Sequence, residues 1–262
     1  MKRRPYEEYI EPGRIFGNLY FVGTRGVSTH IIDTGDGLIM IDPGYPESLY
    51  LVINNMYKLG FRPEDVKYLV HSHGHYDHIG ATKAMQMLTG AKTFLGEPDA
   101  KIAEGLSPLS LAEECKSVFT EFFTPDVLLR DGDIIALGNT KILCVATPGH
   151  SEGTMSFFFD VTDGKSTYRA GMHGGAGTNT LTDAHLEKYG LSDECRAQFL
   201  NSLDRLENEK VDIFIGNHPQ NNDTEGKLRH MTSSDTPPFI DPTAFKKFII
   251  ERRAAYERAV KK

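Results

Sequence analysis

The residues with the clearest chemical potential lie in one short stretch, between positions 71 and 78. Four of the chain's ten histidines fall within it, together with one aspartate. Alternate residues of an extended segment point to the same side, so His73 and His75 are spaced to bind one metal ion. Asp77 and His78 follow where the chain turns, and we expect them to face a second, adjacent ion. Imidazole and carboxylate ligands suit zinc, with iron or manganese as poorer alternatives.

Two predicted elements position this stretch. Residues 65–70 are rich in β-branched and aromatic side chains, which predicts a buried strand. Residues 79–88 predict a helix, because apolar side chains recur there at helical spacing. The histidines therefore lie on the loop between a strand and a helix, where α/β proteins commonly place functional groups. A solvated surface loop is the alternative, but His150 and His218 lie downstream in contexts that also suit metal ligands.

The pattern H-x-H-x-D-H at positions 73–78, directly after a buried strand, resembles the signature of the metallo-β-lactamase superfamily. Three further motifs follow in the order of that family. Asp42 ends an early apolar strand, His150 follows Pro148-Gly149, and His218 lies between a glycine-asparagine pair and a proline. The four motifs together extend over most of the chain.

The resemblance implies two zinc ions and divides the ligands between them. The first ion would be bound by three imidazoles, those of His73, His75 and His150. The second would be bound by Asp77, His78 and His218. Asp77 would also be the catalytic residue that orients the nucleophile. Asp42 would support the metal loop without binding metal, and its alternative role is to cap the helix predicted for residues 47–59.

The strand predicted at residues 168–172 departs from much of the family. Many hydrolases of this superfamily have an aspartate here that bridges the two metals, whereas this chain has Met172, whose thioether is a weak zinc ligand. The site therefore resembles the third subclass of metallo-β-lactamases, in which the nucleophilic water alone bridges the ions. The next residue, His173, is either an extra ligand, a substrate contact or a hydrogen-bonded histidine beside the site.

A loop rich in glycine and threonine follows, from residue 174 to residue 191. We expect it to line the cleft and to offer Thr178, Asn179 and Tyr189 as substrate contacts. A solvated surface loop is the alternative for each of these residues.

The order of elements predicts an α/β protein with two similar halves. A strand-rich pattern opens the chain and recurs from about residue 127 to residue 170. The family resemblance implies one domain, residues 1–262, built as a four-layer αββα sandwich of two mixed sheets, with βα halves at about 1–124 and 125–262. Helices are predicted for residues 97–115, interrupted near Pro108, for residues 192–208 and for residues 242–260.

Composition limits the partners that the chain could have. The formal net charge is −7 without a basic block, which disfavours nucleic-acid binding. No apolar stretch is long enough to span a bilayer, and the charged N-terminus lacks the apolar region of an export signal. Three widely spaced cysteines without a C-x-x-C pair favour free thiols in a reducing compartment. We expect a cytoplasmic protein with a small-molecule substrate, and the sequence leaves its oligomeric state open.

The sequence thus predicts a zinc-dependent metallohydrolase with a dinuclear site. A metal-bound hydroxide would attack the carbonyl of a small ester, lactone, thioester or amide. The first alternative is a β-lactamase that acts on β-lactam antibiotics. It is disfavoured because Met172, His173 and Gly174 replace the serines that such enzymes use to hold the drug's carboxylate. The second alternative is a metal-binding interaction or sensor module without catalysis.

Overall fold

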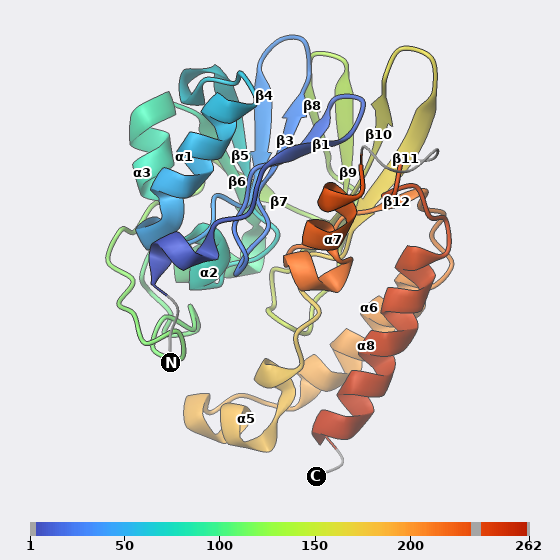
Figure 1. Ribbon diagram of the computed structural model, residues 1–262. Coiled ribbons are helices and arrows are strands. Elements are labelled where there is room, and N and C mark those ends of the chain that lie inside the picture. The colour runs from blue at the N-terminus through green and yellow to red at the C-terminus, as the bar shows by residue number, and fades with distance from the viewer. Residues whose placement is uncertain (1–3, 232–236, 261–262) are drawn as a thin grey trace.

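The computed structural model describes residues 4–231 and 237–260, whose strands form two mixed β-sheets packed face to face (Figure 1). The first sheet has 7 strands in the order β1-β2-β3-β4-β5-β6-β7, antiparallel from β1 to β4 and parallel from β4 to β7. The second has 5 strands in the order β12-β11-β10-β9-β8, and only the β11–β12 pair is parallel. Helices cover the outer faces, which confirms the predicted αββα sandwich.

The strands are short, and all strands of the first sheet precede those of the second along the chain. The first sheet contains β1 (Gly13–Phe16), β2 (Leu19–Phe21), β3 (His30–Asp33), β4 (Leu38–Ile41), β5 (Val66–Val70), β6 (Lys92–Gly96) and β7 (Val127–Leu129). The second contains β8 (Ile134–Leu137), β9 (Thr140–Ala146), β10 (Met155–Thr162), β11 (Thr167–Met172) and β12 (Ile213–Phe214). The first sheet therefore extends to Leu129, a few residues past the boundary between halves that the sequence predicts at about residue 124.

The helices follow the strands that they cover. They are α1 (Leu49–Lys58), α2 (Tyr76–Ile79), α3 (Thr82–Thr89), α4 (Ala100–Ala103), α5 (Asp183–Tyr189), α6 (Glu194–Leu206), α7 (Thr224–Arg229) and α8 (Ala244–Val260). Short 3-10 helices lie at Pro5–Glu8, Pro46–Ser48, Pro63–Asp65, Glu97–Asp99, Asn179–Leu181 and Pro219–Asn221. Within the described residues, no helix is long and apolar enough to cross a membrane.

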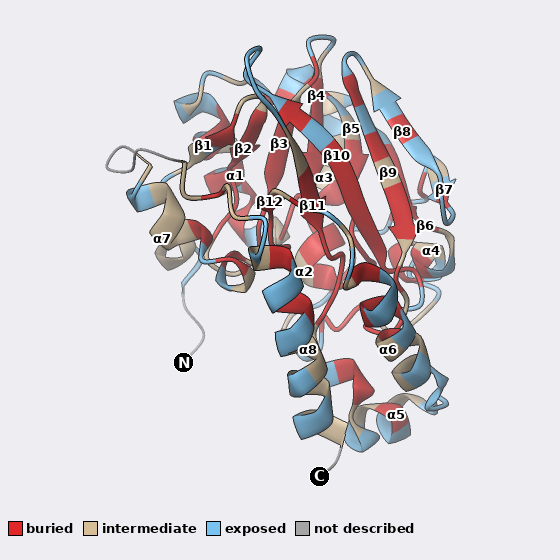
Figure 2. Cartoon of the chain, turned by 90° about the vertical axis from the view of Figure 1, so that its right-hand side faces the viewer, coloured by how far each residue is buried: buried red, intermediate tan, exposed pale blue. Residues whose placement is uncertain are grey.

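Alternation of side chains along the central strands produces the layers. In β4 every residue is buried, with Ile39 and Ile41 in the core between the sheets and Met40 in the core beneath α1 and α3. In β10, Phe157 packs between the sheets while Phe158 packs under α6 and α8. Successive strand residues point to opposite faces, so each sheet is apolar on both sides. Figure 2 shows the consequence: the central strands are buried along most of their length, while α6 and α8 expose their outer sides.

Two stretches differ from the elements predicted by sequence. The helical segment expected to reach residue 115 ends at Ala103, and residues 104–126 have no further helix or strand. Gly105 and Leu111 adopt positive φ angles of 73° and 58°, which a helix does not allow. Within the stretch predicted as a cleft-lining loop, α5 forms because Thr182 caps it by accepting a hydrogen bond from the amide of His185.

The loops that follow β4, β5, β9, β11 and β12 meet at one edge of the sandwich. These loops contain Asp42, positions 71–75, His150, His173 and His218 respectively, and α2, which follows directly, contains Asp77 and His78. Both sheets therefore contribute to this edge, and the candidate metal ligands gather there.

Candidate metal centre

Asp42 is hydrogen-bonded to two residues of the stretch 71–78. It is fully buried and adopts a φ of 54°, a strained conformation for a residue other than glycine. Its carboxylate accepts hydrogen bonds from the Ser72 amide (2.8 Å), the Ser72 hydroxyl (2.6 Å) and Nδ1 of His78 (2.9 Å). The carboxylate thus fixes the loop at its start and orients the imidazole of His78, and it caps no helix.

A first cluster joins His73, His75 and His150, with one ligand atom of each residue within 4.8 Å of the others. Nδ1 of His75 lies 3.1 Å from Nε2 of His150, although one residue follows β5 and the other follows β9. Burial and the neighbouring imidazoles hold the pKa values of His73 and His75 well below normal. Burial also lowers the pKa of His150 to about 4. All three rings are therefore neutral at pH 7, the form that binds a metal ion.

A second cluster joins Asp77, His78 and His218. One oxygen of Asp77 lies 3.3 Å from Nε2 of His78 and 3.6 Å from Nε2 of His218. Burial alone would raise the pKa of Asp77, but the adjacent histidines lower it well below its usual range. Burial would lower the pKa of His78, yet the charges of Asp77 and Asp42 raise it to about 10. The two carboxylates therefore favour a cation at Nε2 of His78, which is either a proton or a metal ion.

The outward nitrogens of four imidazoles in these clusters are already hydrogen-bonded. Each Nδ1–H donates to a backbone carbonyl or a carboxylate: His73 to Gly174 (2.8 Å), His150 to Gly177 (2.9 Å), His218 to Gly26 (2.7 Å) and His78 to Asp42 (2.9 Å). This fixes the tautomer and turns the Nε2 lone pair toward the centre of the site. Nε2 of His73 and of His78 are buried and have no hydrogen-bond partner among the described residues. Buried polar atoms are normally satisfied, so these two atoms fit metal coordination.

His71 shows the contrasting, structural case in the same loop. Its Nδ1 lies 2.8 Å from the carbonyl oxygen of Phe94, and its Nε2 lies 2.8 Å from the hydroxyl of Thr82. Both nitrogens are occupied, so His71 ties β5 to β6 and α3 and takes no part in either cluster.

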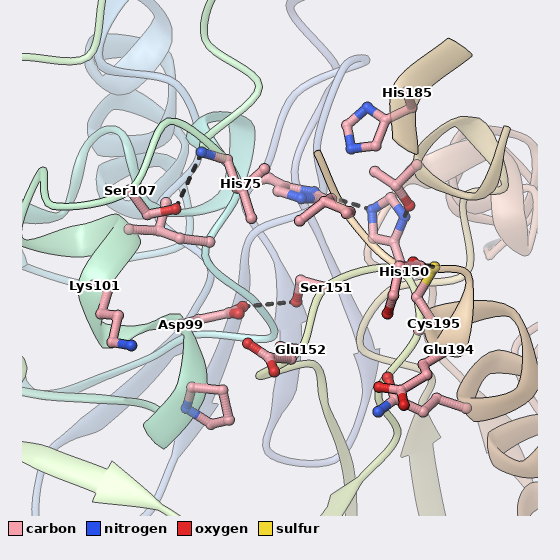
Figure 3. A pocket seen from close by; sticks show the side chains of 18 residues that line it. His75, Asp99, Lys101, Ser107, His150, Ser151, Glu152, His185, Glu194 and Cys195 are labelled. Atoms are coloured by element: carbon pink, nitrogen blue, oxygen red, sulfur yellow. Dashed lines mark hydrogen bonds between the residues drawn. The ribbon is translucent and has the colours of Figure 1, made fainter. Parts of the chain in front are cut away.

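Asp99 is a buried carboxylate that the sequence did not single out. One of its oxygens accepts hydrogen bonds from the Gly74 amide (2.7 Å) and the Ser151 hydroxyl (2.7 Å), and the other accepts one from the Gly153 amide (2.8 Å). Gly74 lies between His73 and His75, whereas Ser151 follows His150, so one side chain connects both loops of the first cluster (Figure 3).

The close approach of Asp99 requires glycine at its partners. A Cβ atom at Gly153 would lie 2.6 Å from Cγ of Asp99, and one at Gly74 would lie 3.0 Å from its Cβ. Burial raises the pKa of Asp99, and the hydrogen bonds from Ser151, Gly74 and Gly153 act against that rise. No sequence motif could have shown this role, because the partners are 25, 52 and 54 positions away.

Two cavities flank the clusters, and His75 and His150 line both of them. The first, of about 220 Å³, has an apolar wall that includes Pro98, Ile102 and Leu191. Figure 3 shows the imidazoles of His75 and His150 meeting at its edge. The second, of about 420 Å³, contains the second cluster's ligands Asp77 and His218, several amide side chains and Arg252.

The four residues predicted as substrate contacts lie in different surroundings. Asn179 lines the second cavity. Thr178 lines neither of the two cavities and precedes the 3-10 helix Asn179–Leu181. Tyr189 donates its hydroxyl to Glu114 at 2.7 Å and also lies outside both linings. His173 is buried, accepts a hydrogen bond from the Gly175 amide at 3.2 Å and joins neither metal cluster.

Met172 is fully buried in the core between the sheets, where it pairs with Phe157 of β10. Its thioether packs against apolar side chains. The position that is an aspartate in many related hydrolases therefore offers no carboxylate to the site.

The two facing sheets and the histidine clusters at their shared edge define an α/β protein with a candidate metal centre. A family model described as the metallo-beta-lactamase superfamily matches residues 22–163, more than half of the chain. The chain belongs to this superfamily. The predicted family, and with it the predicted class of superfamily hydrolase, is thereby confirmed.

The individual proteins that this chain resembles include lactonases among the curated sequences and metallo-beta-lactamases among the solved structures. An N-acyl homoserine lactonase of Bacillus thuringiensis is 25% identical over 221 residues, which cover 71% of this chain and 79% of the lactonase. Alignments with two further curated Bacillus proteins span 59% and 57% of those proteins.

Among solved structures, the subclass B3 metallo-beta-lactamase BJP-1 of Bradyrhizobium japonicum aligns with a TM-score of 0.85 and 26% identity, over 95% of this chain and 92% of that one. The class B3 di-zinc enzyme LRA-12 from an Alaskan soil metagenome aligns with a TM-score of 0.85 and 28% identity, over 99% and 98%. The predicted likeness to the third subclass of metallo-β-lactamases therefore agrees with these structures.

Proposed function

We propose that this chain is a zinc hydrolase with two metal sites that cleaves a small ester, lactone, thioester or amide. One observation carries the proposal: two adjacent groups of possible metal ligands, His73/His75/His150 and His73/Asp77/His78, share His73, and Nε2 of His218 lies 3.6 Å from Asp77. The outer nitrogens of His73, His78, His150 and His218 are already hydrogen-bonded, which leaves their Nε2 atoms on the side of the site. Such an arrangement stabilises bound cations and has no purpose in an ordinary core, where buried nitrogens would have partners.

The residues of the site divide the work of hydrolysis. Zinc, when bound, supplies a Lewis acid for the carbonyl oxygen and lowers the pKa of the attacking water. Asp77 is ionised at neutral pH, because the adjacent histidines lower its pKa, and it can accept a hydrogen bond that orients this water. The apolar first cavity and the polar second cavity receive the two halves of the substrate on either side of His75 and His150.

The substrate is small, because the second cavity, of about 420 Å³, has the size of a small-molecule site and the first, of about 220 Å³, is smaller still. We propose a small-molecule partner and no nucleic acid, in keeping with the net charge of −7. Cys115, Cys144 and Cys195 form no disulfide bond in the described part of the chain, which favours a reducing compartment, and a cytoplasmic location is part of the same proposal.

A β-lactamase is the second candidate, and the likeness to subclass B3 structures over 95% or more of the chain favours it. Met172 does not decide between the two candidates. It replaces the bridging aspartate that the resemblance gives to other hydrolases, the lactonases among them, but with His173 and Gly174 it also replaces the serines that hold a β-lactam carboxylate.

Turnover of probe substrates tests the proposal. Zinc-loaded protein and a chelator-treated control are compared on a chromogenic cephalosporin, an N-acyl homoserine lactone, a thioester and a p-nitrophenyl ester. We expect turnover of at least one probe, lost on chelation and restored by zinc. Fast cephalosporin turnover alone would identify a β-lactamase. Stoichiometric zinc without turnover of any probe would contradict a hydrolase of these compounds and favour a non-catalytic metal-binding module.

A further inference from the structure

Arg252 is the one arginine or lysine, among the described residues, that lines the second cavity. It lies on α8, and Asp77 and His218 line the same cavity. The side chain is held in place, because its guanidinium carbon lies 5.1 Å above the ring of Phe248, which is itself only 3% exposed. A cation stacked on a fixed ring is positioned in advance of any ligand.

The guanidinium of Arg252 lacks the partner that other arginines of this protein have. Its neighbour Arg253 forms an ion pair with Asp204, and Arg196 pairs with Asp183 on α5. For Arg252, no ion pair is formed with a carboxylate of the described residues, and its Nε is buried without a hydrogen-bond acceptor. A buried donor without an acceptor is unfavourable, so the site is suited to an acceptor that arrives with a ligand.

The acidic residues of the same cavity do not take this role. Glu114 accepts hydrogen bonds from Nζ of Lys188 (2.8 Å) and the hydroxyl of Tyr189 (2.7 Å). Asp77 faces His78 and His218. Glu251 precedes Arg252 on the helix and is exposed. Arg252 therefore offers an unpaired, forked donor on the side of the cavity that holds the second cluster.

We propose that Arg252 binds a carboxylate of the substrate, so that this protein acts on small carbonyl compounds that carry an anionic group in the part held by the second cavity. Guanidinium and carboxylate groups match in a bidentate geometry, which gives both affinity and orientation. The apolar part of the same substrate would lie in the first cavity, beyond His75 and His150. This inference rests on the proposed function, because it names the substrate class of the same site.

The test compares two probes that differ at one group, a chromogenic cephalosporin with its free carboxylate and the methyl ester of the same compound, in which the charge is removed and a methyl group added; opening of the β-lactam ring is followed by its colour change. kcat/KM is measured for zinc-loaded wild type, Arg252→Ala, Arg252→Lys and the control Arg253→Ala, whose side chain pairs with Asp204 and does not line the cavity. We expect Arg252→Ala to lower kcat/KM for the carboxylate probe roughly 10- to 100-fold, mostly through KM. The methyl ester should change less than about twofold, and Arg252→Lys should recover part of the loss.

Equal effects of Arg252→Ala on both probes, or no effect on the carboxylate probe, would overturn the inference. If wild type hydrolyses neither probe, the proposed reaction fails for these compounds and Arg252 is tested by binding. Calorimetry then gives the Kd of the intact carboxylate probe for zinc-loaded wild type and Arg252→Ala. A Kd at least tenfold weaker in the variant supports carboxylate binding by Arg252, whereas an equal Kd or absent binding refutes it.

Discussion

Replacing Asp99 with asparagine should weaken zinc binding without removing any metal ligand. The carboxylate accepts hydrogen bonds from two backbone amides and one hydroxyl, across both loops of the first cluster. An asparagine of the same shape has one oxygen, so its NH₂ group must face the amide of either Gly74 or Gly153. One buried N–H is then left without an acceptor, whichever way the side chain turns.

The size of the effect follows from that unsatisfied amide. A buried donor without a partner costs about 1–3 kcal/mol of unfolding free energy. Because burial raises the pKa of Asp99, loss of its charge offsets part of this cost, and we expect the net loss to lie toward the lower end. Since one of the hydrogen bonds that tie the loops of His73, His75 and His150 together is lost, the Kd for zinc should rise about 10- to 100-fold, as for other groups that support metal ligands.

The assay is a competition titration of zinc against a chromogenic chelator, with thermal unfolding of the metal-free protein in parallel. Asp126→Asn is the matched control, because Asp126 also accepts hydrogen bonds from a backbone amide and a hydroxyl, both of Thr93, and contacts neither metal loop. Wild-type zinc affinity in Asp99→Asn, or equal weakening in Asp126→Asn, would refute the reasoning.

Three further predictions concern single side chains. His73→Ala should remove the first zinc and abolish activity, whereas His71→Ala should lower the unfolding temperature and keep both zinc ions. Metal analysis after dialysis distinguishes these outcomes. Zinc retained at the first site in His73→Ala would contradict the ligand assignment. Met172→Asp buries a carboxylate and should lower the unfolding free energy of the metal-free protein by about 3 kcal/mol or more. Excess zinc should restore the unfolding temperature by binding the new carboxylate. Failure to restore it would show that position 172 does not reach the site. Burial lowers the pKa of His30 to about 4, so the unfolded chain binds this proton first as pH falls through 6.5, and His30 should account for up to about 3 kcal/mol of the stability that wild type loses by pH 4; urea titrations should show a loss smaller by about that amount for His30→Phe, and equal losses would count against a neutral His30.

The order of the metal motifs could be predicted from sequence because each is local. The histidines of positions 73–78 are brought together by one loop, and Pro148-Gly149 marks the turn before His150. The apolar runs of β4 and β10 can likewise be recognised in the sequence, and the structure buries all of β4 and residues 155–159 of β10. Fold class and family follow from these signals.

Roles that depend on distant partners could not be predicted. In the sequence, Asp99 is an acidic residue beside a proline with no distinguishing motif. Its hydrogen bonds to the loops of His73 and His150 form only because β6 ends between these two loops. Leu111 and Lys116 adopt positive φ angles that their residue types disfavour, so tertiary packing overrides the helical pattern expected there. Tyr189 lies in a stretch rich in polar residues and turns, and the sequence could not show that α5 places its hydroxyl on Glu114, a residue that lines the second cavity.

Because the two sheets share the site, metal binding depends on how far the chain has been synthesised and folded. His73 and His75 are synthesised long before His150 and His218, so a growing chain cannot complete either ion site until the second sheet has formed and docked. If the proposed zinc ions bind only this docked state, free zinc at 1,000 times its Kd adds about 4 kcal/mol to the stability of the folded chain. A cell depleted of zinc would then contain less of the protein as well as less of its activity, since unliganded chains open more often to proteases.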